Sequence, residues 1–348
     1  MNSKERVLAA IRRTPADRAP RFLWVGSGAA ENMHKELGMD LNEADFFVKN
    51  DVLQTWLTIN KQMMVAAGEG EQFVDEFGIT WQRDGYYNAP ITHPFADLDD
   101  EEMASVTLPD PYDPNRYTEL EKLITEYGDE YFIGADVSGT LFEPAYHLRS
   151  MENILMDMAS ESEEADILLD KLMDFSTAIA VEAVKKGADW IWLGDDMGTQ
   201  ISMIISPDMW RKYFKPRMKK IIDAIRAEKE DAIIAYHSCG SIYPIIGDIA
   251  EIGIDVLNPL QESAADMEHA KIKEEYGDKL TFMCGLDTQT FLRDATPEET
   301  YQAMCQELDL MNRGQGYIGA VSHTIQHDLP VLNIMAIIKA LDEYDYEK

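Results

Sequence analysis

The chain of 348 residues is 45% hydrophobic and carries a formal net charge of −33, so we do not expect it to bind nucleic acid or anionic lipid, which need clustered lysine and arginine. No stretch approaches the ~20 apolar residues of a membrane-spanning helix, and the charged amino-terminal segment is unlike a signal peptide. The three scattered cysteines suit a reducing compartment, and we therefore expect a cytoplasmic protein with no membrane association.

Short apolar runs alternate with longer amphipathic ones from about residue 130 onward, which is typical of parallel sheets with crossover helices. Two runs in the first third bring the number of predicted strands to eight, and the length suits one large barrel. The sequence therefore predicts an α/β fold, a (β/α)₈ TIM barrel, as a single domain over residues 1–348. The predicted strands are residues 21–25, 54–60, 132–137, 190–193, 233–237, 256–258, 280–284 and 317–321.

Residues 71–94 interrupt this pattern in the N-terminal third. The turn-forming pair Asp84-Gly85 lies among Trp81, Tyr86 and Tyr87, which predicts an inserted β-hairpin. Its aromatic side chains either seal the barrel as a satellite core or cover one side of the barrel mouth.

The run that ends in His237-Ser238-Cys239 is the most informative segment for function. Residues two apart on extended backbone project to the same side, so His237 and Cys239 can converge on one point. Imidazole and thiolate are both common zinc ligands. The alternative is a histidine that bonds a loop carbonyl beside a packed cysteine. The position at a barrel mouth favours the metal site.

A catalytic zinc takes about three protein ligands and keeps one position open. Two candidates for the third ligand end the last two predicted strands, Cys284 and His323. All strands of a barrel empty onto one face, so either could reach the pair. Neighbouring Ser322 and Thr324 offer a hydrogen bond to the second ring nitrogen of His323, whereas Cys284 also suits close packing, and this favours His323.

Polar side chains end several other predicted strands, as expected for a barrel active site. Asp195 and Asp196 are the candidate catalytic residues. Adjacent carboxylates at a strand end point in different directions, so we expect one to face the pocket while the other caps the loop. The candidate substrate-binding residues are Asp136, Asn258, Gln261 and Asp287.

Taken together, these segments resemble the uroporphyrinogen decarboxylase superfamily, and within it the branch of cobalamin-dependent methyltransferases. The resemblance runs from about residue 130 to 335, and the first third matches only in outline. The matching blocks are residues 138–144 (SGTLFEP), 194–200 (GDDMGTQ), 214–217 (FKPR), 237–240 (HSCG), 258–261 (NPLQ), 285–289 (GLDTQ) and 322–326 (SHTIQ).

The resemblance implies a (β/α)₈ barrel, with zinc held by a His-x-Cys pair after the fifth strand and a third ligand near the eighth. The pair falls on His237 and Cys239, and the third position, a cysteine in thiol-methylating members, falls on His323. The resemblance also implies a corrinoid (cobalamin) on a partner protein, which exchanges a methyl group with a small methylated substrate such as a methoxylated aromatic, a methylamine or a thiol. Asp195 or Asp196 would orient the substrate or supply a proton.

A decarboxylase or lyase of the uroporphyrinogen decarboxylase type, acting without metal through Asp195 or Asp136, is the alternative. True uroporphyrinogen decarboxylases carry an arginine-rich amino-terminal motif that grips the carboxylates of the porphyrinogen. This chain has Arg18-Ala19-Pro20-Arg21 there, without that cluster. The acidic charge balance also disfavours a polyanionic substrate.

Overall fold

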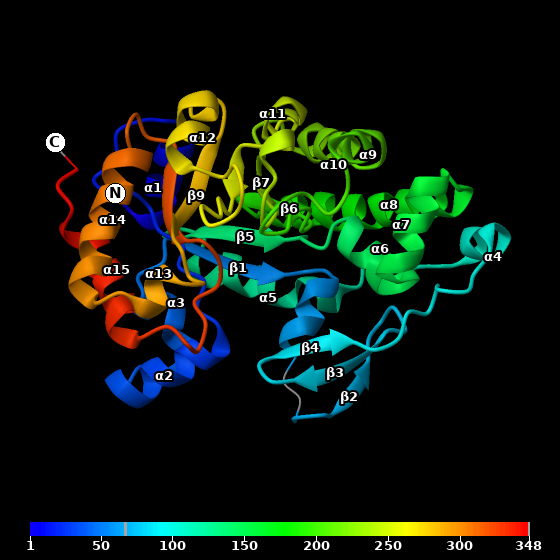
Figure 1. Cartoon of the computed structure of the whole chain (residues 1–348), viewed down its shortest axis with the longest axis horizontal. Helices are drawn as coiled ribbons and strands as arrows, with labels where there is room; N and C mark the ends of the chain where they lie inside the picture. The colour runs from blue at the N-terminus through cyan, green and yellow to red at the C-terminus, as the bar shows by residue number, and fades with distance from the viewer. Residues whose placement is uncertain (66–67, 347–348) are drawn as a thin grey trace.

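The computed structural model describes residues 1–65 and 68–346. Its principal sheet is curled and parallel, and the described residues contribute seven strands: β1 (Val52–Trp56), β5 (Phe132–Asp136), β6 (Trp190–Gly194), β7 (Ile233–His237), β8 (Val256–Asn258), β9 (Thr281–Leu286) and β10 (Tyr317–Val321). They lie side by side in this order, each joined to the next through helices (Figure 1). The predicted TIM-barrel-like α/β fold is confirmed.

The segment predicted as the first strand, residues 21–25, makes only isolated parallel bridges, from Arg21 to Gly319 and from Val25 to Ile325. The main-chain N–H of Arg21 donates to the side chain of Asp51 (2.9 Å) instead of to a neighbouring strand, which interrupts the ladder. The Arg21 carbonyl nevertheless accepts from the N–H of Asp51 (2.9 Å). The expectation of a regular strand is wrong here, but the segment still bridges the gap between β10 and β1.

The second predicted strand, residues 54–60, overlaps β1 only in part, because β1 begins and ends earlier (Val52–Trp56). The chain then turns into the 3₁₀ helix η2 (Ile59–Met64), where the Asn60 side chain donates to Glu143 (2.8 Å). A polar contact with a residue more than eighty positions away thus shapes the end of this element.

Helices surround the sheet, and their first residues follow ordinary capping chemistry. Ser206 accepts from the N–H of Met209, and Thr296 forms a capping box with Glu299. The helices are α1 (Ser3–Ile11), α2 (Ser27–Leu37), η1 (Leu41–Glu43), α3 (Ala44–Phe47), α4 (Asp100–Ser105), α5 (Pro114–Tyr127), α6 (Phe142–Arg149), α7 (Met151–Ser160), α8 (Glu163–Lys186), α9 (Pro207–Tyr213), α10 (Lys215–Glu228), α11 (Tyr243–Ile252), α12 (His269–Tyr276), α13 (Phe291–Asp294), α14 (Pro297–Met311) and α15 (Val331–Glu343). None of the helices in the described part of the chain is long and apolar enough to cross a membrane.

Alternate residues of the strands point into the barrel, where Trp190, Trp192, Ala235 and Met283 pack in one buried cluster. The intervening residues face the helices and belong to a larger buried cluster. This alternation decides which side chains near the strand ends can reach the barrel mouth.

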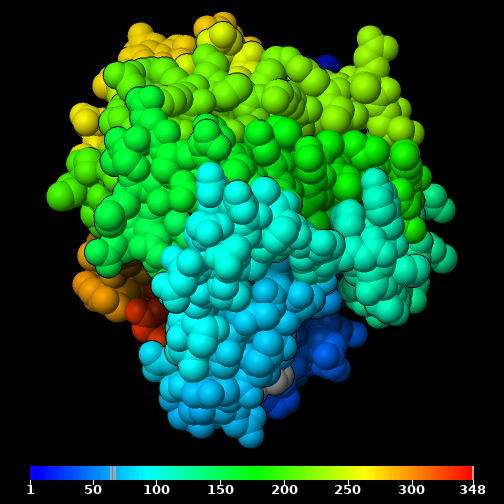
Figure 2. Space-filling view, turned by 90° about the vertical axis from the view of Figure 1, so that its right-hand side faces the viewer, coloured from blue at the N-terminus to red at the C-terminus, as the bar shows by residue number. Residues whose placement is uncertain are grey.

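The inserted hairpin is present as β3 (Thr80–Asp84) and β4 (Tyr87–Pro90), and β2 (Gln72–Val74) adds a third antiparallel strand. The three strands project from the body of the molecule (Figure 2). Trp81 is fully buried and donates to Asp75 (2.8 Å). The Tyr87 hydroxyl donates to Gln326 (2.8 Å), in the loop after β10. One aromatic side chain of the hairpin therefore fills a core, while another contacts the mouth.

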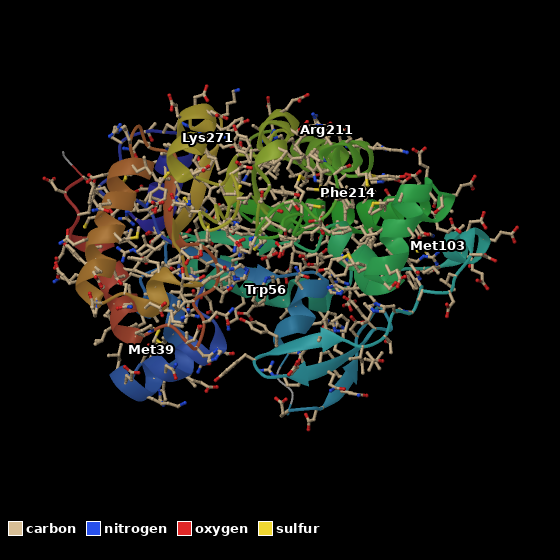
Figure 3. All side chains as sticks on the ribbon, viewed as in Figure 1. Met39, Trp56, Met103, Arg211, Phe214 and Lys271 are labelled. Atoms are coloured by element: carbon tan, nitrogen blue, oxygen red, sulfur yellow. The ribbon has the colours of Figure 1, made fainter. Side chains whose placement is uncertain are left out.

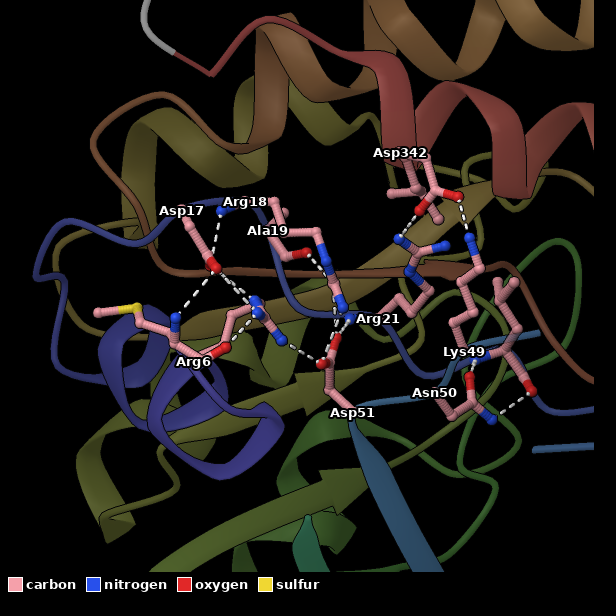
Figure 4. A network of polar contacts seen from close by, with 12 residues as sticks. Arg6, Asp17, Arg18, Ala19, Arg21, Lys49, Asn50, Asp51 and Asp342 are labelled. Atoms are coloured by element: carbon pink, nitrogen blue, oxygen red, sulfur yellow. Dashed lines mark hydrogen bonds and ion pairs between the residues drawn. The ribbon is translucent and has the colours of Figure 1, made fainter. Parts of the chain in front are cut away.

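Ion pairs bind the amino-terminal segment to the end of the barrel opposite the mouth (Figure 4). Asp51, which directly precedes β1, is buried and pairs with Arg6 (2.6 Å) and Arg18 (2.7 Å). Arg21 is also buried and pairs with Asp342. Both arginines of the Arg18–Arg21 segment are therefore occupied by carboxylates of this chain.

Candidate active site

His237, Cys239 and His323 lie together at the carboxyl end of the sheet. His237 is the last residue of β7, Cys239 follows two positions later, and His323 lies two positions after β10. One ligand atom from each lies within 4.8 Å of the other two, and His237 Nε2 is 3.4 Å from Cys239 Sγ. The carboxyl ends of parallel strands meet at one edge, which explains how residues about eighty positions apart converge.

Asn258, the last residue of β8, determines which nitrogen of His237 is free. Its Nδ2 donates to the carbonyl of Met283 (2.9 Å), so its Oδ1 faces His237 Nδ1 at 2.7 Å. An oxygen acceptor requires a proton on Nδ1, and Nε2 is therefore directed toward Cys239. Asn258 thus lies behind His237 with both ends of its side chain engaged, whereas the sequence placed it among substrate-binding residues.

Asp196 is the carboxylate that faces this cluster. Its Oδ1 lies 3.5 Å from His237 Nε2 and accepts from the N–H of Cys239 (2.8 Å). Burial disfavours the charged form of His237, but Cys239 and Asp196 together raise its pKa well above the ordinary value. Burial raises the pKa of Cys239 to about 12, and burial together with the charge of His237 lowers the pKa of His323 to about 4. Without a metal, the cluster therefore holds a proton at His237, which a divalent cation can replace.

Asp195 points away from the cluster and is fully enclosed. Its carboxylate accepts from the N–H groups of Leu141 and Glu143 (each 3.0 Å) at the start of α6. Burial raises its pKa, as does neighbouring Glu143. Of the two adjacent aspartates, Asp195 anchors a helix and Asp196 faces the mouth.

Glu143 is a residue near the site that the sequence analysis missed, although it lies inside one of the matching blocks. Its carboxylate accepts from Asn60 (2.8 Å) and from the N–H of Asp196 (3.2 Å). Burial, followed by the charge of Asp196, raises its pKa to about 7. Its position at the start of α6 gave no signal, because contact with Asp196 depends on how this helix folds over the end of β6.

Asp136 ends β5 inside the barrel and is fully buried. It accepts from Gln54 (2.8 Å) and from both the N–H (2.8 Å) and the hydroxyl (2.6 Å) of Ser138. Burial raises its pKa to about 6 despite these donors. The structure thus places a second titratable carboxyl within the upper part of the barrel.

Two tryptophans, Trp24 and Trp192, pack against the histidines, and a third, Trp56, packs against Trp24. The ring of Trp24 lies 6.4 Å from His323 in a stacked arrangement and 5.5 Å from Trp56, measured between centroids. Trp192 stacks on His237 at 6.1 Å. Trp56 lies near the centre of the molecule (Figure 3). The two histidines therefore lie against an aromatic layer formed by Trp24 and Trp192.

A pocket of about 330 Å³ opens directly beside Cys239 and His323. None of its described lining residues is a lysine or an arginine. It therefore offers hydrogen-bonding groups to a small molecule but no cation for a carboxylate or sulfonate. The other lining residues are Gln261, Thr288, Gln289, Thr324, Gln326 and Asp328.

Gln261 lines this pocket, as expected for a substrate-binding candidate, and its Oε1 also accepts from the N–H of Gly240. Asp287 instead accepts from the N–H groups of Thr290 (2.8 Å) and Phe291 (3.1 Å) at the start of α13. It is not among the described lining residues, and its contacts are those of a helix cap.

Cys284, the alternative third ligand, lies on the other face of the sheet. Met283 points into the barrel, so its neighbour Cys284 must face the helices. Its Sγ lies 3.8 Å from Glu307 of α14 and belongs to a separate cluster. Cys284 therefore cannot complete the His237–Cys239 pair in this fold.

A barrel whose strands end in polar side chains is an architecture of many enzymes. Residues 79–344, more than half of the chain, match the family described as Uroporphyrinogen decarboxylase (URO-D), and the protein belongs to this family.

Relatives of two kinds are similar in sequence. The methylcobamide:CoM methyltransferase MtbA of Methanosarcina mazei is 23% identical over 362 residues, covering 99% of this chain and 98% of the relative. MtaA of Methanosarcina barkeri, of the same activity, is 26% identical, but the match covers 51% of this chain and only 49% of that protein. The uroporphyrinogen decarboxylase of Chlorobium limicola is 24% identical, covering 53% of this chain and 51% of the relative.

Among solved structures, a methyltransferase from Methanosarcina mazei superposes with a TM-score of 0.75. The alignment covers 99% of both chains at 17% sequence identity, and it establishes the shared fold.

Proposed function

We propose that this protein is a zinc-dependent methyltransferase that moves a methyl group between a small methylated substrate and a corrinoid protein. The observation that carries the proposal is the convergence of His237, Cys239 and His323 beside an open pocket. The methyltransferase relatives, one of them aligned over almost the whole chain, support it.

The three side chains fit a catalytic zinc. They are two imidazoles and one thiol, they leave one position open, and the other nitrogen of His237 is held by Asn258. When bound, zinc supplies Lewis acidity to the heteroatom that loses or gains the methyl group. The donor set with a second histidine, rather than a second thiol, is less electron-rich, which suits activation of a leaving oxygen or nitrogen.

The carboxyl groups beside the cluster would handle the proton. Asp196 faces the cluster, and Glu143 contacts the Asp196 backbone with a pKa near 7, so Glu143 can hold a proton at physiological pH and release it. The proposed roles are orientation of the substrate by Asp196 and storage of a proton at Glu143. The pocket wall, with the amides of Gln261, Gln289 and Gln326, would bind the rest of a methoxylated aromatic, methylamine or thiol.

The corrinoid protein would dock on the rim. The loop after β6 carries Ile201, whose side chain is 82% exposed. Gln200 in the same loop donates to Gln289 of the pocket wall (2.8 Å). An exposed apolar side chain fixed beside the pocket is suited to contact a partner that must bring its cobalt to the mouth.

The test has two measurements. One is the zinc content per chain, and the other is the absorbance change as a series of methylated substrates transfers a methyl group to free cob(I)alamin. Cys239→Ser is expected to lose one zinc per chain relative to the wild type and to lose transfer, with little change in unfolding. Cys305→Ser, on α14, is the matched control. Undiminished transfer by the Cys239 variant would contradict the proposal.

The alternative, metal-independent decarboxylation through Asp136, has one supporting observation, the pKa of about 6 for this buried carboxyl. The pairing of Arg18 with Asp51 and of Arg21 with Asp342 leaves these arginines unable to grip a porphyrinogen at the mouth. Carbon dioxide release by zinc-free protein separates the two functions, because only the alternative predicts it.

A further inference from the structure

A second group of metal-binding side chains lies outside the barrel, between the sheet and the helix layer. His269 is the first residue of α12, Cys284 belongs to β9, and Glu307 belongs to α14. The three elements adjoin one another on one side of the molecule (Figure 1). The side chains are 1%, 0% and 8% exposed, and one ligand atom from each lies within 4.8 Å of the other two.

The hydrogen bonds of His269 require a proton or a metal ion between its Nδ1 and Glu307. Its Nε2 lies 2.9 Å from the carbonyl of Leu260, which can only accept, so Nε2 carries a proton. In a neutral imidazole, Nδ1 is then an acceptor, yet it lies 2.9 Å from an oxygen of Glu307. Two lone pairs at this distance repel unless a proton or a metal ion lies between them. The same oxygen is also approached by Cys284 Sγ at 3.8 Å.

The chemistry of the three donors selects zinc. Imidazole, thiolate and carboxylate are all zinc ligands, and ligating histidines usually donate their second N–H to a carbonyl, as His269 does. A zinc ion with one thiolate and one carboxylate is electrically neutral, which suits a buried position. The second oxygen of Glu307 supplies a fourth ligand atom if the carboxylate binds through both. Lys273, whose positive charge lies near Cys284, donates its hydrogen bond to the carbonyl of Gln315 (2.7 Å).

We propose that His269, Cys284 and Glu307 form a structural zinc site, separate from the mouth, that joins α12 and α14 to β9. This inference does not depend on the proposed function. Cys284 would thus bind zinc, but in this second site and not as the third ligand of the His237–Cys239 pair.

The test counts zinc per chain by elemental analysis of protein produced in zinc-replete medium. The wild type is expected to bind two zinc ions, Cys284→Ala and Glu307→Gln one, and the mouth variant Cys239→Ala one. Cys305→Ala, on α14, is the matched control and keeps two. One zinc in the wild type, retained by Cys284→Ala and lost by Cys239→Ala, would overturn this inference and leave the proposed function intact.

The reverse result, one zinc lost only with Cys284, would support this inference and remove the zinc from the proposed function. Zinc at neither site would overturn both. Because a core variant can fail to fold, anomalous diffraction at the zinc edge from zinc-loaded wild-type crystals provides a second measurement. A peak among the three side chains is expected, and a zinc peak at the mouth alone would show that His269 and Glu307 share a proton instead.

Discussion

Replacing Asn258 by alanine tests how the proposed mouth zinc is held. The variant removes the acceptor 2.7 Å from His237 Nδ1, so the ring loses the contact that directs Nε2 to Cys239. Loss of such an outer contact typically weakens metal binding about 10–100-fold, or roughly 1.4–2.7 kcal/mol. The buried carbonyl of Met283 also loses its donor, which costs about 1–3 kcal/mol of folding free energy.

The assay is competition for zinc with a chromophoric chelator at constant pH, together with urea unfolding of the metal-free protein. Gln289→Ala, which removes a pocket-wall amide, is the control and is expected to leave zinc affinity unchanged. Asn258→Asp keeps an acceptor for His237 and should retain more affinity than the alanine variant. The expected loss of zinc affinity is at least tenfold. If Asn258→Ala still unfolds cooperatively and its zinc affinity at the mouth is within about twofold of wild type, the assigned role of Asn258 is wrong.

The two adjacent aspartates should differ in the effect of substitution. Asp195→Asn is expected to lower the free energy of unfolding by about 1–3 kcal/mol, because it replaces one of the two carboxyl oxygens that accept from the N–H groups of Leu141 and Glu143 at the start of α6. Asp196→Asn should instead slow methyl transfer about 10²-fold with a smaller effect on unfolding, and equal effects on both measurements would contradict the division. Burial raises the pKa of Glu143 to about 7, so protonation stabilises the folded state at low pH, and this stabilisation is lost as pH rises through 7. Urea unfolding of the metal-free protein should therefore show a free energy of unfolding that falls over roughly pH 5–8, and the fall should be shallower in Glu143→Gln. The same pH dependence in wild type and variant would contradict this role of Glu143. Ile201→Glu is expected to raise the KM for a methylated corrinoid protein while transfer to free cobalamin is unchanged, and an equal loss with both would exclude a docking role. Uroporphyrinogen should yield no coproporphyrinogen, a result that a simple chromatographic assay can refute.

Much of the fold follows from short-range pattern. The apolar runs from residue 130 onward became β5 to β10, because buried parallel strands must be nearly continuous in apolar residues. The first third was less predictable, since residues 21–25 satisfy their backbone partly through the side chain of Asp51, a contact that no local pattern reveals. The hairpin turn at Asp84-Gly85 was evident, but β2 has only three residues and no comparable signal.

The candidate site was also predictable only in part. His237 and Cys239 could be paired from their spacing, and His323 could be added from its strand end. The exclusion of Cys284 required its side-chain direction, which a one-residue change in the strand boundary reverses. Glu143 could not be found because its contact with Asp196 is made by folding of α6 across the sheet.

The bond between Tyr87 and Gln326 has a consequence for how substrate preference can change. One wall of the pocket rests on a three-stranded insertion that contributes no strand to the barrel, so exposed positions of the insertion can vary while Trp81 stays packed in the core. Relatives with the same ligand cluster and a different insertion would then accept molecules of different width. The insertion is accordingly the part of the molecule to exchange when a different pocket width is sought.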